Sequence, residues 1–115
     1  MAEELFTEKR VFPRFPVSIP LCCFYGDTQV QIHGKTHDIS AEGLGMVLDT
    51  KMPPGTELHL YLEMPDNRER IERNAQVVWI QEVDSGMYRM GLKLQTAPLK
   101  PIPLVLRTLN FQRKY

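Results

Sequence analysis

Two short motifs in this sequence combine side chains that suit a ligand with phosphate groups and a hydrogen-bonding ring. The first motif, Arg10-Val-Phe-Pro-Arg14, carries two arginines on a proline-containing segment near the start of the chain. A guanidinium group can donate two parallel hydrogen bonds to a phosphate, or to the O6 and N7 atoms of a guanine. The motif therefore predicts two contacts to an anionic or guanine-bearing ligand.

The second motif, Asp38-Ile-Ser40-Ala-Glu-Gly43, brings a carboxylate, a hydroxyl and a glycine together within a few residues. A carboxylate accepts hydrogen bonds from the N1–H and N2–H₂ groups of guanine, and a hydroxyl can donate to a phosphate. Glycine lets the backbone approach a ligand closely. The two motifs together complement a small ligand that carries both guanine and phosphate.

In type, order and spacing, the two motifs resemble the signature of the PilZ family of bacterial cyclic di-GMP receptors. That signature is RxxxR followed, after a spacer of roughly twenty to thirty residues, by [D/N]xSxxG. The resemblance covers nearly the whole chain, because Gln76-Val-Val-Trp79-Ile is similar to the family's later strand and Tyr88-Arg-Met-Gly91-Leu-Lys-Leu94 to its closing strand. Glu42 departs from the pattern, since many members have a second glycine there, and it adds negative charge beside the expected phosphate site.

The resemblance implies a receptor or adaptor that binds cyclic di-GMP, changes conformation and regulates an unidentified effector protein in motility, exopolysaccharide production or virulence. It implies no cofactor beyond this ligand. Lys9 is a less certain contact that could support a second, stacked ligand. The ligand-binding residues that follow from the motifs are Arg10, Arg14, Asp38, Ser40 and Gly43.

Two other functions fit parts of the sequence. One is a PilZ-like adaptor that binds no nucleotide and acts through protein contacts, which the intact motifs disfavour. The other is an OB-like barrel that binds single-stranded nucleic acid. The neutral net charge and the few aromatic residues in strands disfavour this second function. No Ser/His/Asp or Cys/His set and no metal-ligand cluster is visible, so we expect a binding protein and not an enzyme.

The hydrophobic pattern predicts an all-β protein, a six-stranded antiparallel barrel with a C-terminal α-helix, and the resemblance implies that the barrel is of the PilZ type. Short strands separated by turn residues, with no alternation of strands and helices, indicate a barrel and not a parallel sheet. Gly34 suggests a β-bulge within its strand. The expected strands are Val17–Tyr25, Gln29–Ile39, Leu44–Leu48, Glu57–Glu63, Arg73–Val83 and Tyr88–Leu94.

After Pro98 the apolar residues change to helical spacing. We expect one amphipathic helix whose main stripe, formed by Ile102, Val105, Leu106 and Leu109, packs on the barrel. Leu104 and Phe111 fall off this stripe and widen the apolar face. That wider face is either a broader core contact or a surface for self-association or a partner, so a homodimer is possible.

These elements divide the chain into a flexible N-terminal segment with the two arginines (1–15), the barrel (16–97) and the helix (98–115). We expect the N-terminal segment to be mobile without ligand, because Arg10 and Arg14 have no obvious protein partner and repel one another. Ligand phosphates would neutralise both charges and close the segment over the barrel surface.

The composition agrees with a single domain of this kind. The chain has 115 residues, of which 43% are hydrophobic and 24% charged, and its formal net charge is zero. No global positive field would attract DNA or RNA. No apolar run reaches the ~18 residues that would span a membrane. The acidic start of the chain lacks the apolar region of a signal peptide, so we expect a cytoplasmic location.

Overall fold

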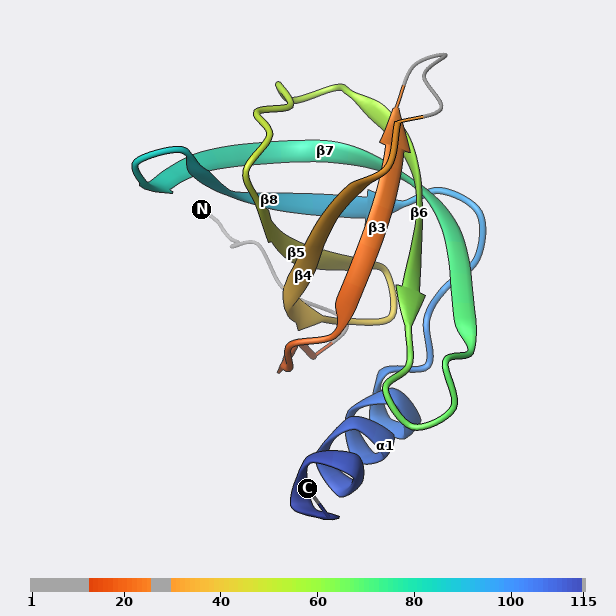
Figure 1. Ribbon diagram of the computed structural model, residues 1–115. Coiled ribbons are helices and arrows are strands. Elements are labelled where there is room, and N and C mark those ends of the chain that lie inside the picture. Colours follow the sequence, from red (N-terminus) through yellow and green to blue (C-terminus); the bar gives the residue numbers. More distant parts are fainter. Residues whose placement is uncertain (1–12, 26–29, 115) are drawn as a thin grey trace, which may run out of the picture.

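The computed structural model describes residues 13–25 and 30–114, so Lys9 and Arg10 lie outside the described residues. The expected strands are present with small changes in their ends, and a short additional strand precedes them (Figure 1). The elements are β2 (Phe15–Pro16), β3 (Pro20–Tyr25), β4 (Ile32–Ile39), β5 (Gly43–Leu48), β6 (Glu57–Glu63), β7 (Arg70–Asp84), β8 (Met87–Leu94) and the helix α1 (Pro101–Lys114).

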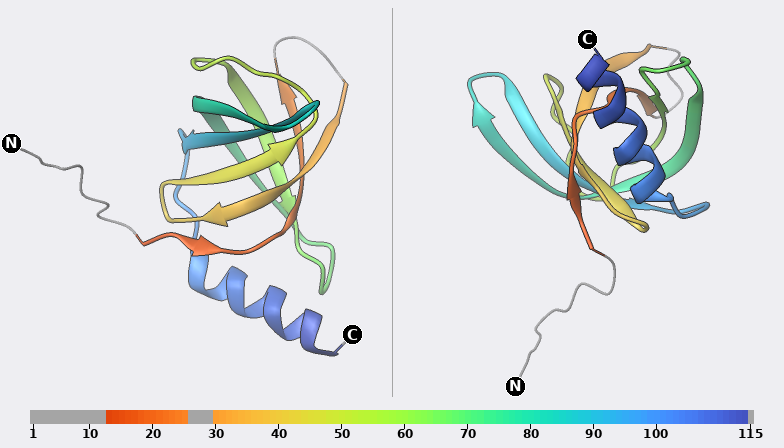
Figure 2. Two further views of the ribbon diagram at one scale, coloured as in Figure 1. Left: turned by 90° about the vertical axis from the view of Figure 1, so that its left-hand side faces the viewer. Right: turned by 90° about the horizontal axis from the view of Figure 1, so that it is seen from below.

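The strands form a closed antiparallel barrel, as the sequence predicts. Six strands pair in the order β4-β3-β6-β7-β8-β5, and pairing between β4 and β5 closes the ring. The additional strand, β2, pairs with the last two residues of β4, where Phe15 lies opposite Ile39 and Pro16 opposite Asp38. The helix lies across one end of the barrel, with β2 between that end and the start of α1 (Figure 2).

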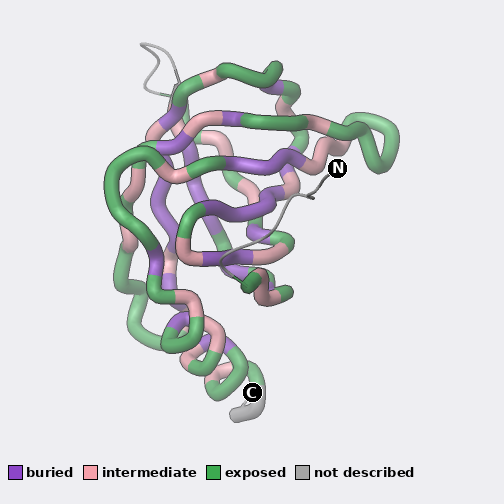
Figure 3. The backbone as a smooth tube through the Cα atoms, turned by 180° about the vertical axis from the view of Figure 1, so that it is seen from behind, coloured by how far each residue is buried: buried purple, intermediate pink, exposed green. Residues whose placement is uncertain are grey.

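The barrel interior is filled by alternate side chains of every barrel strand. Buried residues lie along the barrel strands, whereas the hairpin that joins β7 to β8 extends outward and is exposed (Figure 3). The largest fully buried side chains are Ile19, Ile39, Leu44, Met46, Leu48, Met52, Leu60, Leu62, Met64, Met90, Val77 and Thr36.

Thr36 is a buried polar residue whose hydroxyl joins β4 to the segment between β2 and β3. The hydroxyl donates to the carbonyl oxygen of Val17 and accepts a hydrogen bond of 2.9 Å from the backbone N–H of Ile19. The backbone N–H of Thr36 also donates to the carbonyl oxygen of Ile19, at 2.9 Å. These bonds satisfy the backbone where β2 and β3 do not form a continuous ladder with β4.

The expected bulge at Gly34 is wrong. The β4–β5 register shifts between Thr36 and Asp38, so the extra residue is His37. Gly34 serves a different purpose, because a Cβ atom there would lie only 2.6 Å from the carbonyl oxygen of Val47. The glycine therefore allows close approach between β4 and the end of β5.

The expected helix is present, but the prediction of which face packs on the barrel is wrong for three of the four stripe residues, since only Val105 packs partly against the core. Ile102, Leu106 and Leu109 are exposed, with 56%, 54% and 46% of their surface accessible. Leu104 and Thr108, one turn apart, form the buried face instead. Apolar spacing defines a stripe but does not say which neighbouring stripe meets the barrel, and here Leu104 meets it next to buried Leu99.

Within the described residues, no helix is long and apolar enough to cross a membrane. The same part of the chain contains no group of three or more histidine, cysteine, aspartate or glutamate side chains that could hold a metal ion.

Replacing Thr36 by valine should lower the free energy of unfolding by about 2–3 kcal/mol, because the N–H of Ile19 and the carbonyl of Val17 lose a buried partner. Urea denaturation measures this change. Thr96→Val is the control, since the Thr96 hydroxyl is exposed and accepts a long hydrogen bond of 3.3 Å from the N–H of Asn74, which water can replace, so its loss should change stability by less than about 0.5 kcal/mol. Equal stability of the two variants would show that the Thr36 hydroxyl does not support the strand junction.

Candidate functional site

A hollow of about 340 Å³ on the outer surface of the barrel brings together residues of five strands and the segment before β2. It contains two arginines, one histidine, one aspartate and one tryptophan, which is an unusual density of groups that bind anions and planar rings. Its lining residues are Arg14, Pro16, His37, Asp38, Gly45, Trp79 and Arg89.

The bulge in β4 explains why Asp38 reaches this outer hollow. Thr36 is buried and faces the interior, so strict alternation from Thr36 would turn Asp38 inward and Ile39 outward. Ile39 is buried instead. The extra residue at His37 changes the alternation, and His37 and Asp38 both face outward.

A second bulge, in β7, turns the side chain of Trp79 outward. The β7–β8 register shifts between Val77 and Trp79, which makes Val78 the extra residue. Val77 is buried, whereas Val78 and Trp79 are both exposed, at 48% and 39%. Without the bulge, Trp79 would share the inward face of Val77 and would be part of the core.

Two glycines on the outer face of the sheet, Gly45 and Gly91, form the floor of the hollow, and the side chains of Asp38 and Trp79 lie over them. Asp38 pairs with Gly45, Gly45 with Gly91, and Gly91 with Trp79, in one row across β4, β5, β8 and β7. A Cβ atom on Gly45 would lie 2.9 Å from Oδ1 of Asp38, and one on Gly91 would overlap the Trp79 indole. Both side chains therefore lean over backbone that carries no side chain of its own.

Arg14 and Asp38 contact each other directly. Nη2 of Arg14 donates to Oδ1 of Asp38 at 2.7 Å, and Nε donates to Oδ2 at 3.3 Å. The backbone N–H of Gly45 donates to the same Oδ1 at 2.9 Å. The expectation that Arg14 has no protein partner is therefore wrong, because Asp38 supplies one.

The environment of Asp38 keeps it ionised. Burial on its own would raise the pKa of this carboxyl group, but the hydrogen bonds and charge of Arg14, together with the Gly45 N–H, outweigh it. The net effect is a pKa below the usual range for aspartate. A carboxylate held in this form is ready to accept hydrogen bonds from a ligand.

Ser40 and Gly43 lie in the turn after Asp38 and do not line the hollow. The buried Ser40 hydroxyl is 3.2 Å from both the backbone N–H and the carbonyl oxygen of Gly43. The N–H of Ser40 also donates to the Gly43 carbonyl at 2.8 Å. These contacts hold the turn that joins β4 to β5, and with it the end of the strand that carries Asp38.

The opposite wall of the hollow is formed by Arg89 and Trp79. The Arg89 guanidinium lies 5.8 Å from the centre of the Trp79 ring, within the range of a cation–π contact. Neither Trp79 nor Arg89 is among the ligand-binding residues that the sequence predicts. The available signal was the loss of alternation in Val77-Val78-Trp79, where three large apolar residues follow one another.

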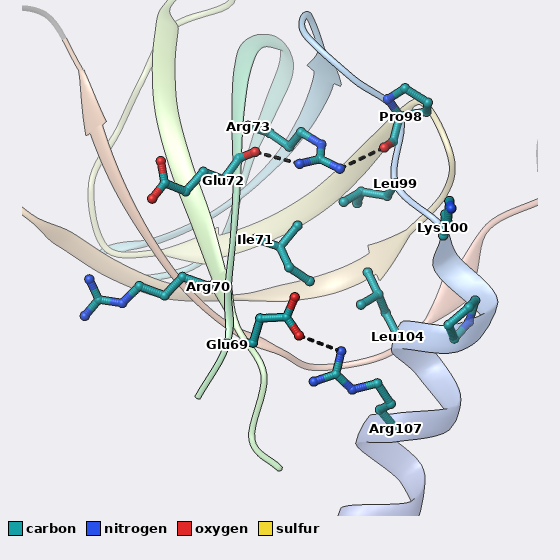
Figure 4. A pocket seen from close by; sticks show the side chains of 11 residues that line it. Glu69, Arg70, Ile71, Glu72, Arg73, Pro98, Leu99, Lys100, Leu104 and Arg107 are labelled. Atoms are coloured by element: carbon teal, nitrogen blue, oxygen red, sulfur yellow. Dashed lines mark hydrogen bonds and ion pairs between the residues drawn. The ribbon is translucent and has the colours of Figure 1, made fainter. Parts of the chain in front are cut away.

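A larger hollow of about 410 Å³ lies between β7 and α1 (Figure 4). Three of its charged residues, Glu69, Arg73 and Arg107, already have protein partners. Arg107 donates to both carboxylate oxygens of Asp66, at 2.9 and 2.8 Å, and Arg73 donates to the carbonyl oxygen of Pro98 at 2.9 Å. These contacts tie the helix to the barrel, so we place the candidate ligand site in the outer hollow with Arg14 and Asp38.

Comparison with known proteins identifies the fold. The PilZ domain family model matches residues 8–107. No curated protein matches the sequence.

Several solved structures are similar at low sequence identity. The Bacillus subtilis inhibitor of motility MotI (DgrA) has a TM-score of 0.66 and 18% identity, with 93% of this chain and 53% of that chain covered. The PilZ domain of YcgR from Escherichia coli, solved with c-di-GMP, has a TM-score of 0.66 and 15% identity over 93% and 94% of the two chains. The PilZ domain of CeSA from a cellulose-synthesising bacterium has a TM-score of 0.55 and 20% identity over 90% and 99%. This chain thus spans about half of MotI and nearly all of the two isolated domains.

The carboxyl group of Asp38 should titrate below about pH 3.9, the ordinary value for aspartate. Because its pKa is lower in the folded state, its contribution to stability is present above that value and is lost as the pH falls through the folded pKa. Carbon-detected NMR titration measures the pKa directly. In Arg14→Ala the pKa should rise, and an unchanged pKa would mean that Arg14 does not hold the carboxylate.

Replacing Gly91 by alanine should displace Trp79 from the floor of the hollow. The fluorescence of Trp79, the only tryptophan in the chain, should shift toward that of a solvated indole, and stability should fall by about 1–3 kcal/mol from overpacking. Fluorescence and urea denaturation test both effects. An unchanged emission spectrum would contradict the placement of the indole over Gly91.

Proposed function

This chain belongs to the PilZ domain family, and we propose that it is a receptor for cyclic di-GMP that passes the binding event to a partner protein. The observation that carries the proposal is the Arg14–Asp38 pair beside the glycine floor. One side chain suits phosphate or the O6/N7 edge of guanine, and the other suits the N1/N2 edge of guanine. YcgR, whose PilZ domain was solved with c-di-GMP, shares the fold.

In this proposal Asp38 selects the base. Its carboxylate accepts hydrogen bonds from N1–H and N2–H₂ of guanine, a pair of donors that adenine does not present in this arrangement. The Gly45 N–H already fixes the position of one carboxylate oxygen. A carboxylate that is oriented before binding loses little freedom when the ligand arrives.

Arg14 changes partner in this proposal. In the unliganded protein it is paired with Asp38, and a ligand that takes the carboxylate also offers the guanidinium a phosphate or guanine edge in its place. The exchange keeps a charge-assisted contact for Arg14 in both states. It also moves a side chain whose backbone leads directly into β2.

The wall opposite Asp38 supplies the remaining contacts. Trp79 is a planar surface on which a purine ring can stack, and Arg89 beside it carries a positive charge toward the phosphates. The missing side chains of Gly45 and Gly91 let the Asp38 carboxylate and the Trp79 indole lie close against the sheet. We propose that the ligand lies between Asp38 and Trp79.

The remaining motif residues complete the proposed site. Arg10 would supply a second guanidinium from the N-terminal segment, and Lys9 a further positive charge. Ser40 and Gly43 would act at the β4–β5 turn, where they hold the end of the strand that carries Asp38.

In this proposal, β2 transmits the effect of ligand binding to a partner protein. Residues alternate along this segment, so Arg14 and Pro16 line the ligand hollow while Pro13 and Phe15 line a separate apolar hollow against the start of α1. A change in Arg14 would therefore alter the surface that β2 shares with the helix. The exposed apolar side chains Ile102, Leu106 and Leu109 give an effector, or a second copy of the chain, a surface to contact.

The proposed role is therefore binding and signalling, without catalysis. The effector would belong to motility, exopolysaccharide production or virulence, and the receptor would act in the cytoplasm. The solved relative MotI is described as an inhibitor of motility, which agrees with the first of these pathways.

Replacing Arg14 by alanine should weaken cyclic di-GMP binding by about 2–4 kcal/mol, because a charge-assisted contact is lost. Isothermal titration calorimetry measures the affinity. Lys51→Ala is the matched control, because it removes one positive charge from an exposed position outside the hollow and should leave the affinity unchanged. Equal affinities for Arg14→Ala and the wild-type chain would remove Arg14 from the site.

A further inference from the structure

His37 lies beside Asp38 on the same face of the barrel, which adjacent residues of a regular strand do not do. The bulge in β4 produces this arrangement, because His37 is the extra residue of the register shift. Its Nδ1 atom is 3.6 Å from Oδ2 of Asp38, and 44% of its side chain is exposed. His37 therefore borders the proposed ligand site with a ring that water, or a ligand, can reach.

Charged groups from three elements surround His37. Asp38 is its neighbour on β4, Arg14 comes from the segment before β2, and Arg89 comes from β8. Lys35 is the next outward residue on β4. The two arginines and Lys35 place positive charges around His37, and Asp38 places a negative charge beside it.

A cyclic dinucleotide would change this balance. Its two phosphodiester groups stay ionised across the pH range of the experiment and bring two negative charges into the hollow. These charges favour the protonated imidazole, which has an N–H donor on both ring nitrogens.

Resting on the function proposed above, we infer that His37 is a further ligand contact, which takes up a proton when cyclic di-GMP binds and donates a hydrogen bond to a phosphodiester oxygen. Affinity therefore rises as the pH falls. Proton uptake on binding requires this direction, because a complex that holds more protons than the free protein is favoured at low pH.

The other groups that line the hollow do not provide this pH dependence. Arginine stays charged throughout the accessible range, and the pKa of Asp38 is held below its usual range by Arg14 and Gly45 despite partial burial. Histidine is the residue type that changes charge between about pH 5 and pH 8. His37 is the histidine among the lining residues of this hollow.

Calorimetric titration with cyclic di-GMP at about pH 5.5 and about pH 8 tests the inference. The wild-type chain should bind about 3–10-fold more tightly at the lower pH, which is the size of one ordinary net hydrogen bond. In His37→Gln, which keeps a polar side chain and loses the charge, the two affinities should be equal. Titration in two buffers of different ionisation enthalpy should show net proton uptake for the wild-type chain and none for His37→Gln.

His33→Gln is the matched control. His33 is an exposed residue on the same outer face of β4, roughly 13 Å along the strand from His37, and its replacement should keep the full pH dependence. Circular dichroism at both pH values checks that each variant is folded.

Two results separate this inference from the function on which it rests. Binding of equal strength at both pH values in the wild-type chain, or an unchanged pH dependence in His37→Gln, overturns the inference and leaves the receptor function intact. Absence of cyclic di-GMP binding at both pH values overturns the receptor function and the inference together.

Discussion

The ion pair between Arg14 and Asp38 depends on an irregularity in the backbone, and the rest of the site is arranged around it. Asp38 faces outward because the bulge at His37 interrupts the alternation of β4. Arg14 reaches it because β2 pairs with the end of the same strand. The Gly45 N–H completes the contact by fixing a carboxylate oxygen. A closed barrel has a packed interior, so a ligand must use its outer face. The bulge at His37 in β4 and the bulge at Val78 in β7 turn the necessary side chains toward that face.

Much of the fold could be predicted from the sequence because it follows from local patterns. Alternating apolar residues and turn signals identify the six barrel strands, and the change of period after Pro98 identifies the helix. The motif spacing predicted a site with Arg14 and Asp38, and the structure brings these two residues into contact. Trp79 and Arg89 were not predicted as site residues, because their position depends on a bulge in β7 and on cross-strand pairing with Gly91. Register of this kind is a tertiary property.

The helix is a second element that the sequence predicts only in part. Its position and approximate length follow from the apolar period, but the choice between the stripe of Leu104 and that of Leu106 does not. Contacts distant in sequence decide it, since Arg107 is held by Asp66 and Glu69 in the β6–β7 loop. With this face turned to the barrel, Leu106 and its neighbours are exposed. Of these exposed residues, Ile102 lines the same hollow as Phe15 of β2, the strand that directly follows Arg14.

A titration that compares three ligands tests the central claim most directly. The wild-type chain is titrated with cyclic di-GMP, with GTP and with a single-stranded oligonucleotide, and binding is followed by calorimetry and by the fluorescence of Trp79. The account predicts saturable binding of cyclic di-GMP with a change in Trp79 emission, and much weaker binding of the other two ligands. Binding of the oligonucleotide in preference to cyclic di-GMP would indicate an OB-like function. Failure to bind any of the three would contradict the receptor function and favour an adaptor that acts through protein contacts alone.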